Sequence, residues 1–89
     1  MMMKMELKDT ISGMLSDDYK ERFKAEYFQT KIRLEKLERF LNKIQAAIIT
    51  KNEGPKHECP TSLLKSQQIA MEEYLKTLEI RAEIEGVEL

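Results

Sequence analysis

The sequence predicts an all-α protein: an antiparallel two-helix hairpin with a short N-terminal helical extension, assembling into a helical homo-oligomer. Two long stretches carry apolar residues at alternating steps of four and three, the spacing of a helix packed along a narrow seam. A segment that holds both prolines of the 89-residue chain separates these stretches. The two helices also carry more apolar surface than one shared interface can bury.

The first predicted helix covers residues 18–50. Ser16 or Asp17 is the expected N-cap, because a short polar side chain at that position accepts a hydrogen bond from a free amide of the first turn. A helix of roughly 30 residues is about 45 Å long at the usual rise. The apolar seam comprises Phe23, Tyr27, Thr30, Leu34, Leu37, Leu41, Ile44 and Ile48, and Phe40 widens it near the C-terminal end.

Residues 51–60 form the predicted loop, since its two prolines and Gly54 cannot continue a helix. The second predicted helix covers residues 61–85. Pro60 suits its first turn, with Cys59, Thr61 or Ser62 available as a cap, and Gly86 is the expected stop. The seam of this helix comprises Leu64, Gln68, Met71, Leu75, Leu78 and Ala82.

Residues 1–15 form an N-terminal extension with the pattern of a short amphipathic helix that Ser12-Gly13 interrupts. Residues 16–89 form the hairpin domain. We expect the extension to pack on the hairpin or on another copy of the chain.

Self-association follows from the surplus of apolar side chains. A hairpin has one shared face, and ordering its backbone costs on the order of 1–2 kcal/mol per residue. A second copy supplies the missing apolar surface. The residues assigned to the core and the oligomer interface are Phe23, Leu34, Leu37, Phe40, Leu41, Ile44, Ile48, Leu64, Met71, Leu75 and Leu78.

Composition restricts the class of protein further. Net charge is −1, which gives no overall basic field for a nucleic acid polymer. Nine Lys/Arg against five Asp/Glu give residues 18–51 a charge of +4, whereas three against six give residues 61–89 a charge of −3. No apolar run approaches the roughly 20 residues of a membrane span. The lone Cys59 favours a reducing cytoplasm.

The chain offers little catalytic chemistry, so we expect no enzyme, metal or cofactor. His57 and Cys59 are two zinc-type ligands where a structural site needs about four, and the simpler interpretation is a loop that ends at a helix start. The paired carboxylates of residues 72–73 fit a solvated helix face. No glycine-rich phosphate loop or nucleophile motif is present.

Aromatic and basic side chains recur along both predicted helices, and Tyr19 and Arg22 lie at the end of the hairpin where Tyr74 and Arg81 are also expected. Aromatic rings stack on bases, and arginine holds phosphate through two parallel hydrogen bonds. The alternative interpretation is that the tyrosines rim the core and the arginines extend over them. The residues of this group are Tyr19, Arg22, Tyr27, Gln67, Tyr74 and Arg81.

A set of spaced residues carries a family resemblance. In the first helix these are Tyr19, Arg22, Leu34, Leu37, Phe40 and Leu41, and in the second they lie in CPTSLLKSQQIAMEEYLKTLEIRAEIEG, residues 59–86. With them the chain resembles, over residues 18–89, a family of small phage and prophage proteins first labelled in a crAss-like phage. Ser62 departs from the pattern, where an acidic residue is expected.

That family is similar in architecture to the helical-hairpin proteins that phages use against CBASS and Thoeris immunity. The similarity implies an oligomer that sequesters a cyclic nucleotide signal without cleaving it, in the cytoplasm of an infected bacterium. It also implies a ligand site built from Tyr19, Arg22, Tyr27, Tyr74 and Arg81, with Lys20 and Lys24 as electrostatic support. The competing hypothesis is a structural or adaptor module, similar to a coiled coil, that binds a host or phage protein.

Overall fold

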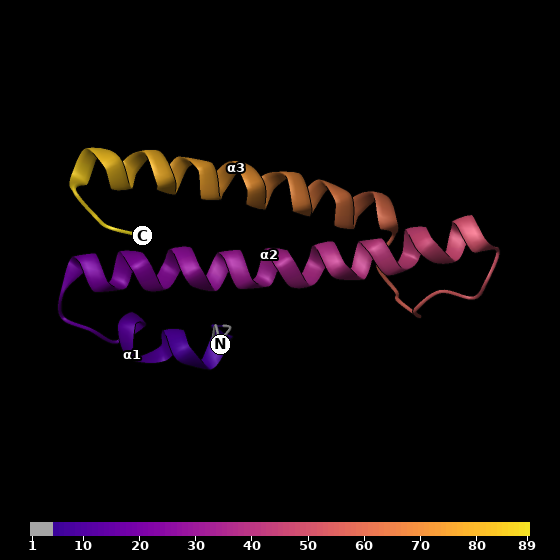
Figure 1. The fold of residues 1–89 in the computed structure, drawn as a ribbon, viewed down its shortest axis with the longest axis horizontal. Coiled ribbons are helices and arrows are strands. Elements are labelled where there is room, and N and C mark those ends of the chain that lie inside the picture. The colour runs from indigo at the N-terminus through magenta and orange to yellow at the C-terminus, as the bar shows by residue number, and fades with distance from the viewer. Residues whose placement is uncertain (1–4) are drawn as a thin grey trace, which may run out of the picture.

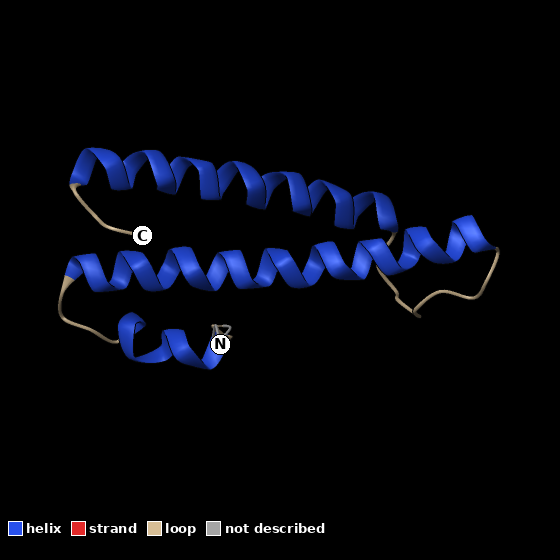
Figure 2. Cartoon of the chain, in the orientation of Figure 1, coloured by secondary structure: helices blue, strands red, loops and turns tan. Residues whose placement is uncertain are grey.

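The computed structural model describes residues 5–89, which form two short and two long helical segments (Figure 1). A 3-10 helix, η1 (Leu7–Thr10), runs into α1 (Ile11–Met14), and α2 (Tyr19–Thr50) and α3 (Thr61–Glu85) follow. Residues 1–4 of the predicted extension lie outside the described part. Over residues 5–89 there is no strand, and none of the helices is both long and apolar enough to cross a membrane (Figure 2).

The long helix α2 is the central layer of the molecule. The antiparallel α3 lies along one side of it, and η1 and α1 lie along the opposite side, over its N-terminal half (Figure 1). The described chain is elongated, with extents of 49 × 27 × 26 Å. The all-helical hairpin expected from the periodicity is therefore present.

The start of α2 lies slightly later than the capping pattern indicates. The N-cap is Asp18, whose carboxylate accepts a hydrogen bond from the Lys20 amide at 3.0 Å. The expected caps, Ser16 and Asp17, were wrong by one or two residues. The Ser16 hydroxyl instead accepts from the Asp18 amide and closes the turn before the helix.

The loop after α2 turns back along that helix. Lys51 adopts the left-handed conformation (φ 57°), and the Asn52 amide donates to the Ala47 carbonyl at 2.9 Å. The loop then brings His57 against Phe40, with ring centroids 5.7 Å apart. As a result α3 begins well before the end of α2, as the ribbon shows (Figure 1).

This early start of α3 corrects one expectation about the hairpin seam. Ile48 continues the heptad spacing, yet 63% of its surface is exposed in the single chain because it lies beyond the reach of α3. Its predicted role at an oligomer interface stays a prediction.

The hairpin core lies where α3 faces the N-terminal half of α2. Leu78 is the most deeply buried side chain at 1% exposure, and fully burying a leucine contributes roughly 1.5–3 kcal/mol. The buried cluster comprises Phe23, Tyr27, Leu34, Leu75, Leu78, Ala82 and Val87, with Phe28 and Met71 packed against it. Leu41 and Ile44 are also buried, whereas Leu37, Phe40 and Leu64 are half-buried.

The C-terminal tail completes this core. Pro60 is the N-cap of α3 rather than its first residue, no side-chain cap comes from Cys59, Thr61 or Ser62, and Gly86 follows the last helical residue as expected, with φ at 72°. The left-handed glycine turns the chain back, so that the Val87 amide donates to the Ala82 carbonyl at 2.9 Å. Val87 is thereby buried against α2 and α3.

The N-terminal layer packs on the other side of α2, through small residues. Thr10, Ala25 and Ile32 are buried there. A Cβ placed on Gly13 would lie 2.9 Å from the Ala25 Cβ and 3.4 Å from the Glu21 carbonyl oxygen. The missing side chain at residue 13 is therefore what lets α1 approach α2 closely.

We expect Gly13→Ala to loosen the N-terminal layer by about 1–3 kcal/mol, since the added methyl overlaps an immobile Cβ. Amide hydrogen exchange of residues 10–15 should accelerate. Ser12→Ala, at an exposed position of the same helix, is the control, and Gly13→Ala/Ala25→Gly should recover protection. Unchanged exchange in Gly13→Ala would contradict this packing.

We expect Lys51→Gly to stabilise the protein by about 0.5–1 kcal/mol, because glycine adopts the left-handed conformation without the Cβ penalty. Chemical denaturation measures the change. Lys51→Ala keeps the Cβ and should give no comparable gain. Equal effects of the two substitutions would show that the backbone conformation is not the cause.

Candidate functional site

A hollow opens at the end of the hairpin where α2 begins and α3 ends. It measures about 330 Å³ and brings together three of the predicted ligand residues, of which Tyr19 and Arg81 are 62 positions apart in the sequence. Its lining consists of Met14, Tyr19, Arg22, Phe23, Glu26 and Arg81. The volume lies at the lower end of the range for small-molecule sites, roughly 300–1,000 Å³.

A closed ring of hydrogen bonds holds two of these residues in place. The Tyr19 hydroxyl donates to Glu85 Oε1 at 2.7 Å and accepts from Arg81 Nη2 at 2.7 Å. Arg81 Nε donates to Glu85 Oε2 at 2.9 Å, one helical turn along α3. The Arg81–Tyr19–Glu85 ring therefore joins the start of α2 to the end of α3.

An aromatic ring packs against the same arginine. The Arg81 guanidinium carbon lies 5.1 Å from the centroid of the Phe23 ring, a cation–π distance. The Tyr19 ring meets Phe23 edge-on at 6.2 Å. Arg22 donates from Nη1 to the Ser16 carbonyl at 2.8 Å and so also folds toward the hollow. The site thus combines exposed aromatic edge with two guanidinium groups, the chemistry that suits a base attached to a phosphate.

Hydrogen bonding in the ring shifts the pKa values of Glu85 and Tyr19. The bond from Tyr19, followed by that from Arg81, lowers the pKa of the Glu85 carboxyl below its ordinary value. The same bond to Glu85 is the main cause that raises the pKa of Tyr19. Glu85 consequently stays ionised at neutral pH and balances Arg81. The guanidinium is oriented, and part of its charge is already compensated.

The remaining predicted ligand residues lie outside the hollow. Tyr74 is exposed, two helical turns from Arg81 on the same flank of α3. Lys20 caps α3, donating to the Gly86 carbonyl at 3.2 Å. Lys24 lies 3.7 Å from Glu21 and lines a separate hollow under the N-terminal layer.

Tyr27 is buried on the opposite flank of the hairpin, at 6% exposure. Its hydroxyl donates to Glu79 Oε2 at 2.8 Å. A second hollow there, of about 680 Å³, is lined by Tyr27 and by Glu79, Glu83 and Glu88. Three carboxylates repel an anionic ligand. The hairpin therefore has a flank with two arginines and a flank that is acidic.

His57 and Cys59 are engaged in their own loop. The His57 Nδ1–H donates to the Cys59 carbonyl, since a carbonyl oxygen can only accept, at 2.7 Å. Over residues 5–89 no three His, Cys, Asp or Glu side chains gather as a metal ion requires. The contact explains both residues as part of the turn that leads into α3.

Sequence reasoning missed four members of the site, the first of which is Met14 in the lining of the hollow. Phe23 was assigned to the core alone, although its ring also supports Arg81. Glu26 lines the hollow, and Glu85 orients Arg81. The Arg81-x-x-x-Glu85 spacing places the two side chains on one helix face and was the available signal for that pair.

Comparison with known proteins gives one match. A family model described as Sequestin matches residues 17–84, which include Tyr19, Arg22, Phe23 and Arg81. No curated protein and no solved structure matches the chain. The matched region omits the N-terminal layer and ends one residue before Glu85.

We expect Tyr27 to ionise late. Burial, followed by its hydrogen bond to Glu79, raises its pKa from 10.0 to about 12. Since unfolding restores the ordinary pKa, this contribution to stability is complete below pH 10 and is lost as pH rises toward 12. In a pH titration followed by tyrosinate absorbance, the difference between the unsubstituted protein and Tyr27→Phe should be one tyrosine that ionises above pH 10.

Denaturation midpoints should also fall less steeply above pH 10 in Tyr27→Phe than in the unsubstituted protein. Tyr74→Phe, which removes an exposed hydroxyl, is the control. A Tyr27 signal that is already complete near pH 10 would contradict the burial argument.

Proposed function

The chain belongs to the Sequestin family, and on that premise we propose that it binds and sequesters a cyclic nucleotide immune signal without turning it over. The family's name supports a binding role rather than a catalytic one. In this proposal the protein is phage-encoded and acts as an oligomer in the cytoplasm of the infected bacterium, lowering the free concentration of the signal.

The observation that carries the proposal is the convergence of Tyr19, Arg22 and Arg81 on one hollow. Stacking of a base on an aromatic side chain contributes about 1–3 kcal/mol. A guanidinium that binds phosphate contributes about 1.5–3 kcal/mol through charged hydrogen bonds. Both groups are held by short contacts before any ligand arrives, so binding costs little side-chain ordering.

The chemistry of the lining also favours retention of the ligand over its cleavage. Hydrolysis of a phosphodiester needs an activated water, a general base or a metal. Glu85 is committed to Tyr19 and Arg81, with its pKa lowered, which makes it a poor general base at neutral pH. Glu26 also lines the hollow, but among the described residues of the lining no histidine or second carboxylate lies beside it. The side chains of the hollow therefore suit binding and charge neutralisation.

We expect one member of a panel of cyclic di- and trinucleotides and ADP-ribose derivatives to stabilise the protein. At a hundredfold excess over the dissociation constant the gain is about 2.7 kcal/mol, seen as a thermal shift. Arg22→Ala should weaken that binding about 10- to 100-fold by calorimetry. Lys43→Ala, about six turns further along α2, should leave it unchanged.

The fate of the bound molecule separates a sponge from an enzyme. After heat release, chromatography should recover the nucleotide unaltered. If no member of the panel shifts the melting temperature, the sequestration proposal fails. The adaptor hypothesis then gains support if Arg22→Ala instead abolishes association with a host or phage protein.

A further inference from the structure

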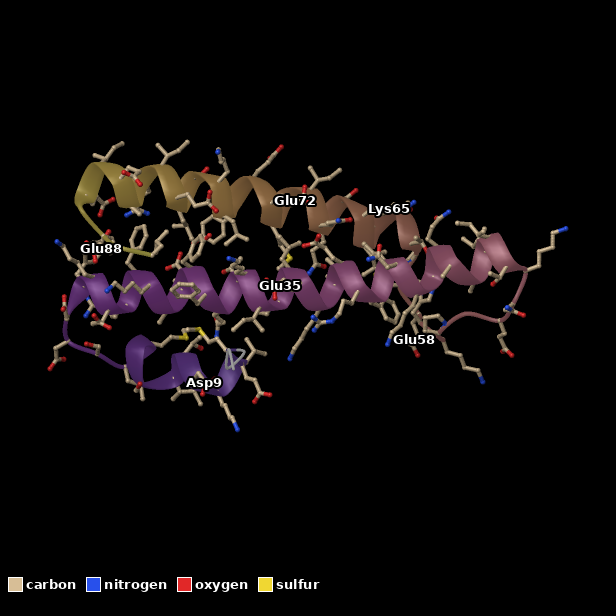
Figure 3. The ribbon with its side chains drawn as sticks, in the orientation of Figure 1. Asp9, Glu35, Glu58, Lys65, Glu72 and Glu88 are labelled. Carbon is tan, nitrogen blue, oxygen red and sulfur yellow. The ribbon has the colours of Figure 1, made fainter. Side chains whose placement is uncertain are left out.

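The face of α3 turned away from α2 is uncovered, and its large apolar side chains alternate with the polar Ser66, Glu73 and Thr77. It lies opposite the buried Leu75 and Leu78, and its larger apolar side chains are between 42% and 79% exposed. In Figure 3 the side chains along this edge of α3 point into solvent, away from α2. The outer face of α3 is formed by Leu63, Ile69, Ala70, Tyr74, Ile80 and Ile84.

A row of charged residues borders this outer face. Lys65, Glu72, Lys76 and Glu83 follow one another at steps of seven, four and seven, so they share one flank of the helix (Figure 3 labels the first two). All four are exposed. Within the described residues, none of them forms an ion pair with another side chain of the chain.

The order of these residues is symmetric about Tyr74. Counting outward from residue 74, Lys76 and Glu72 lie two positions away, and Glu83 and Lys65 lie nine positions away. The apolar residues Ile69 and Ile80, and Leu63 and Ile84, are placed symmetrically to within one position. Charges of opposite sign thus occupy equivalent places on the two halves of one helix.

We propose that the outer face of α3 binds the same face of a second copy, antiparallel, with a two-fold axis beside Tyr74. When two copies of one helix pair antiparallel, the same flank of each copy lies against the other. Lys65 then lies against Glu83 of the second copy, and Lys76 against its Glu72. The two-fold operation repeats each pair, so four opposite-charge contacts border one apolar strip.

Several properties of the face select a second copy over another occupant. A partner that carries charges of only one sign would place a like charge against two of the four charged residues on this flank. Along this flank the copy meets no like charge, because each lysine opposes a glutamate. Glu73, on the face itself, lies close to its own copy near the axis, and Lys76 of the second copy lies one position from it. Small residues, Ala70 and Thr77, lie near the axis and permit close approach of the two helices. From Leu63 to Ile84 the strip is about 32 Å long, enough for six turns of contact.

This arrangement also extends the proposed ligand site, and that consequence rests on the proposed function. Arg81 and Gln67 both lie seven residues from Tyr74, on the same flank. In the dimer Gln67 of the second copy therefore lies beside Arg81. Its amide adds a donor and an acceptor next to a hollow that in one chain measures only about 330 Å³.

Charge exchange tests the interface. In Lys65→Glu/Lys76→Glu every pair becomes Glu–Glu, and in Glu72→Lys/Glu83→Lys every pair becomes Lys–Lys. Each variant alone should dissociate at least about 100-fold more readily than the unsubstituted dimer in sedimentation equilibrium. An equimolar mixture should form a 1:1 heterodimer. Lys36→Glu/Lys43→Glu, on α2, should dimerise normally.

Cross-linking tests the register. With Cys59→Ser as background, Tyr74→Cys should oxidise to a disulfide dimer, because residue 74 meets its own copy at the axis. Ser66→Cys, eight residues away, should not. Circular dichroism of each variant checks that the helices are retained.

A monomeric unsubstituted protein at submillimolar concentration, or variants that fail to combine on mixing, would overturn the interface. A ligand-binding protein that stays monomeric removes this inference and the oligomeric part of the proposed function, but leaves sequestration standing. A dimer with the predicted register that binds no nucleotide removes the proposed function alone.

Discussion

Contact between α3 and the N-terminal half of α2 determines where every other part of the molecule lies. Leu78, almost fully buried, packs in a cluster with Phe23, Tyr27 and Val87. One side of this seam is a single long helix, α2. The register of α3 along α2 therefore fixes which residues of the two chain ends become neighbours. Both polar flanks, the arginine hollow and the acidic hollow, border the same apolar seam. A change of register by one turn would separate Arg81 from Tyr19 and Tyr27 from Glu79.

The polar contacts across the seam are made chiefly by tyrosines. The opposite net charges of the two helices suggest lysine–glutamate pairs between them, but the ion pairs of the described residues are local in sequence. Tyr19 and Tyr27 instead donate to Glu85 and Glu79. A phenol contributes an apolar ring to the seam and a hydroxyl to its edge, whereas exposed ion pairs contribute little. Within the described residues, no lysine of α2 forms an ion pair with α3.

The relation between the two flanks bears on function. Arg22 and Arg81 lie on one side of the hairpin, while Glu79, Glu83 and Glu88 line the other. Of these two flanks, only the one with the arginines offers cations to a phosphate. The N-terminal layer adds Met14 to the lining of that side, so packing of α1 through Gly13 also shapes the site. The outer face of α3, by contrast, is remote from the N-terminal layer and is open to a second copy.

Periodicity alone determined the helical hairpin. The four-and-three spacing placed the second helix at residues 61–85, where α3 is found, and Gly86 as its stop, because local backbone preferences and a single apolar stripe specify both. Tertiary structure decided the rest. The loop turns back along α2, where His57 contacts Phe40, so α3 begins before the end of α2. Ile48 is therefore uncovered, although its spacing matches the seam. The register of α3 on α2 brought Tyr19 to the Arg81–Glu85 pair and Tyr27 to Glu79, on opposite flanks. Residues separated by more than sixty positions meet only through packing, which no local pattern encodes.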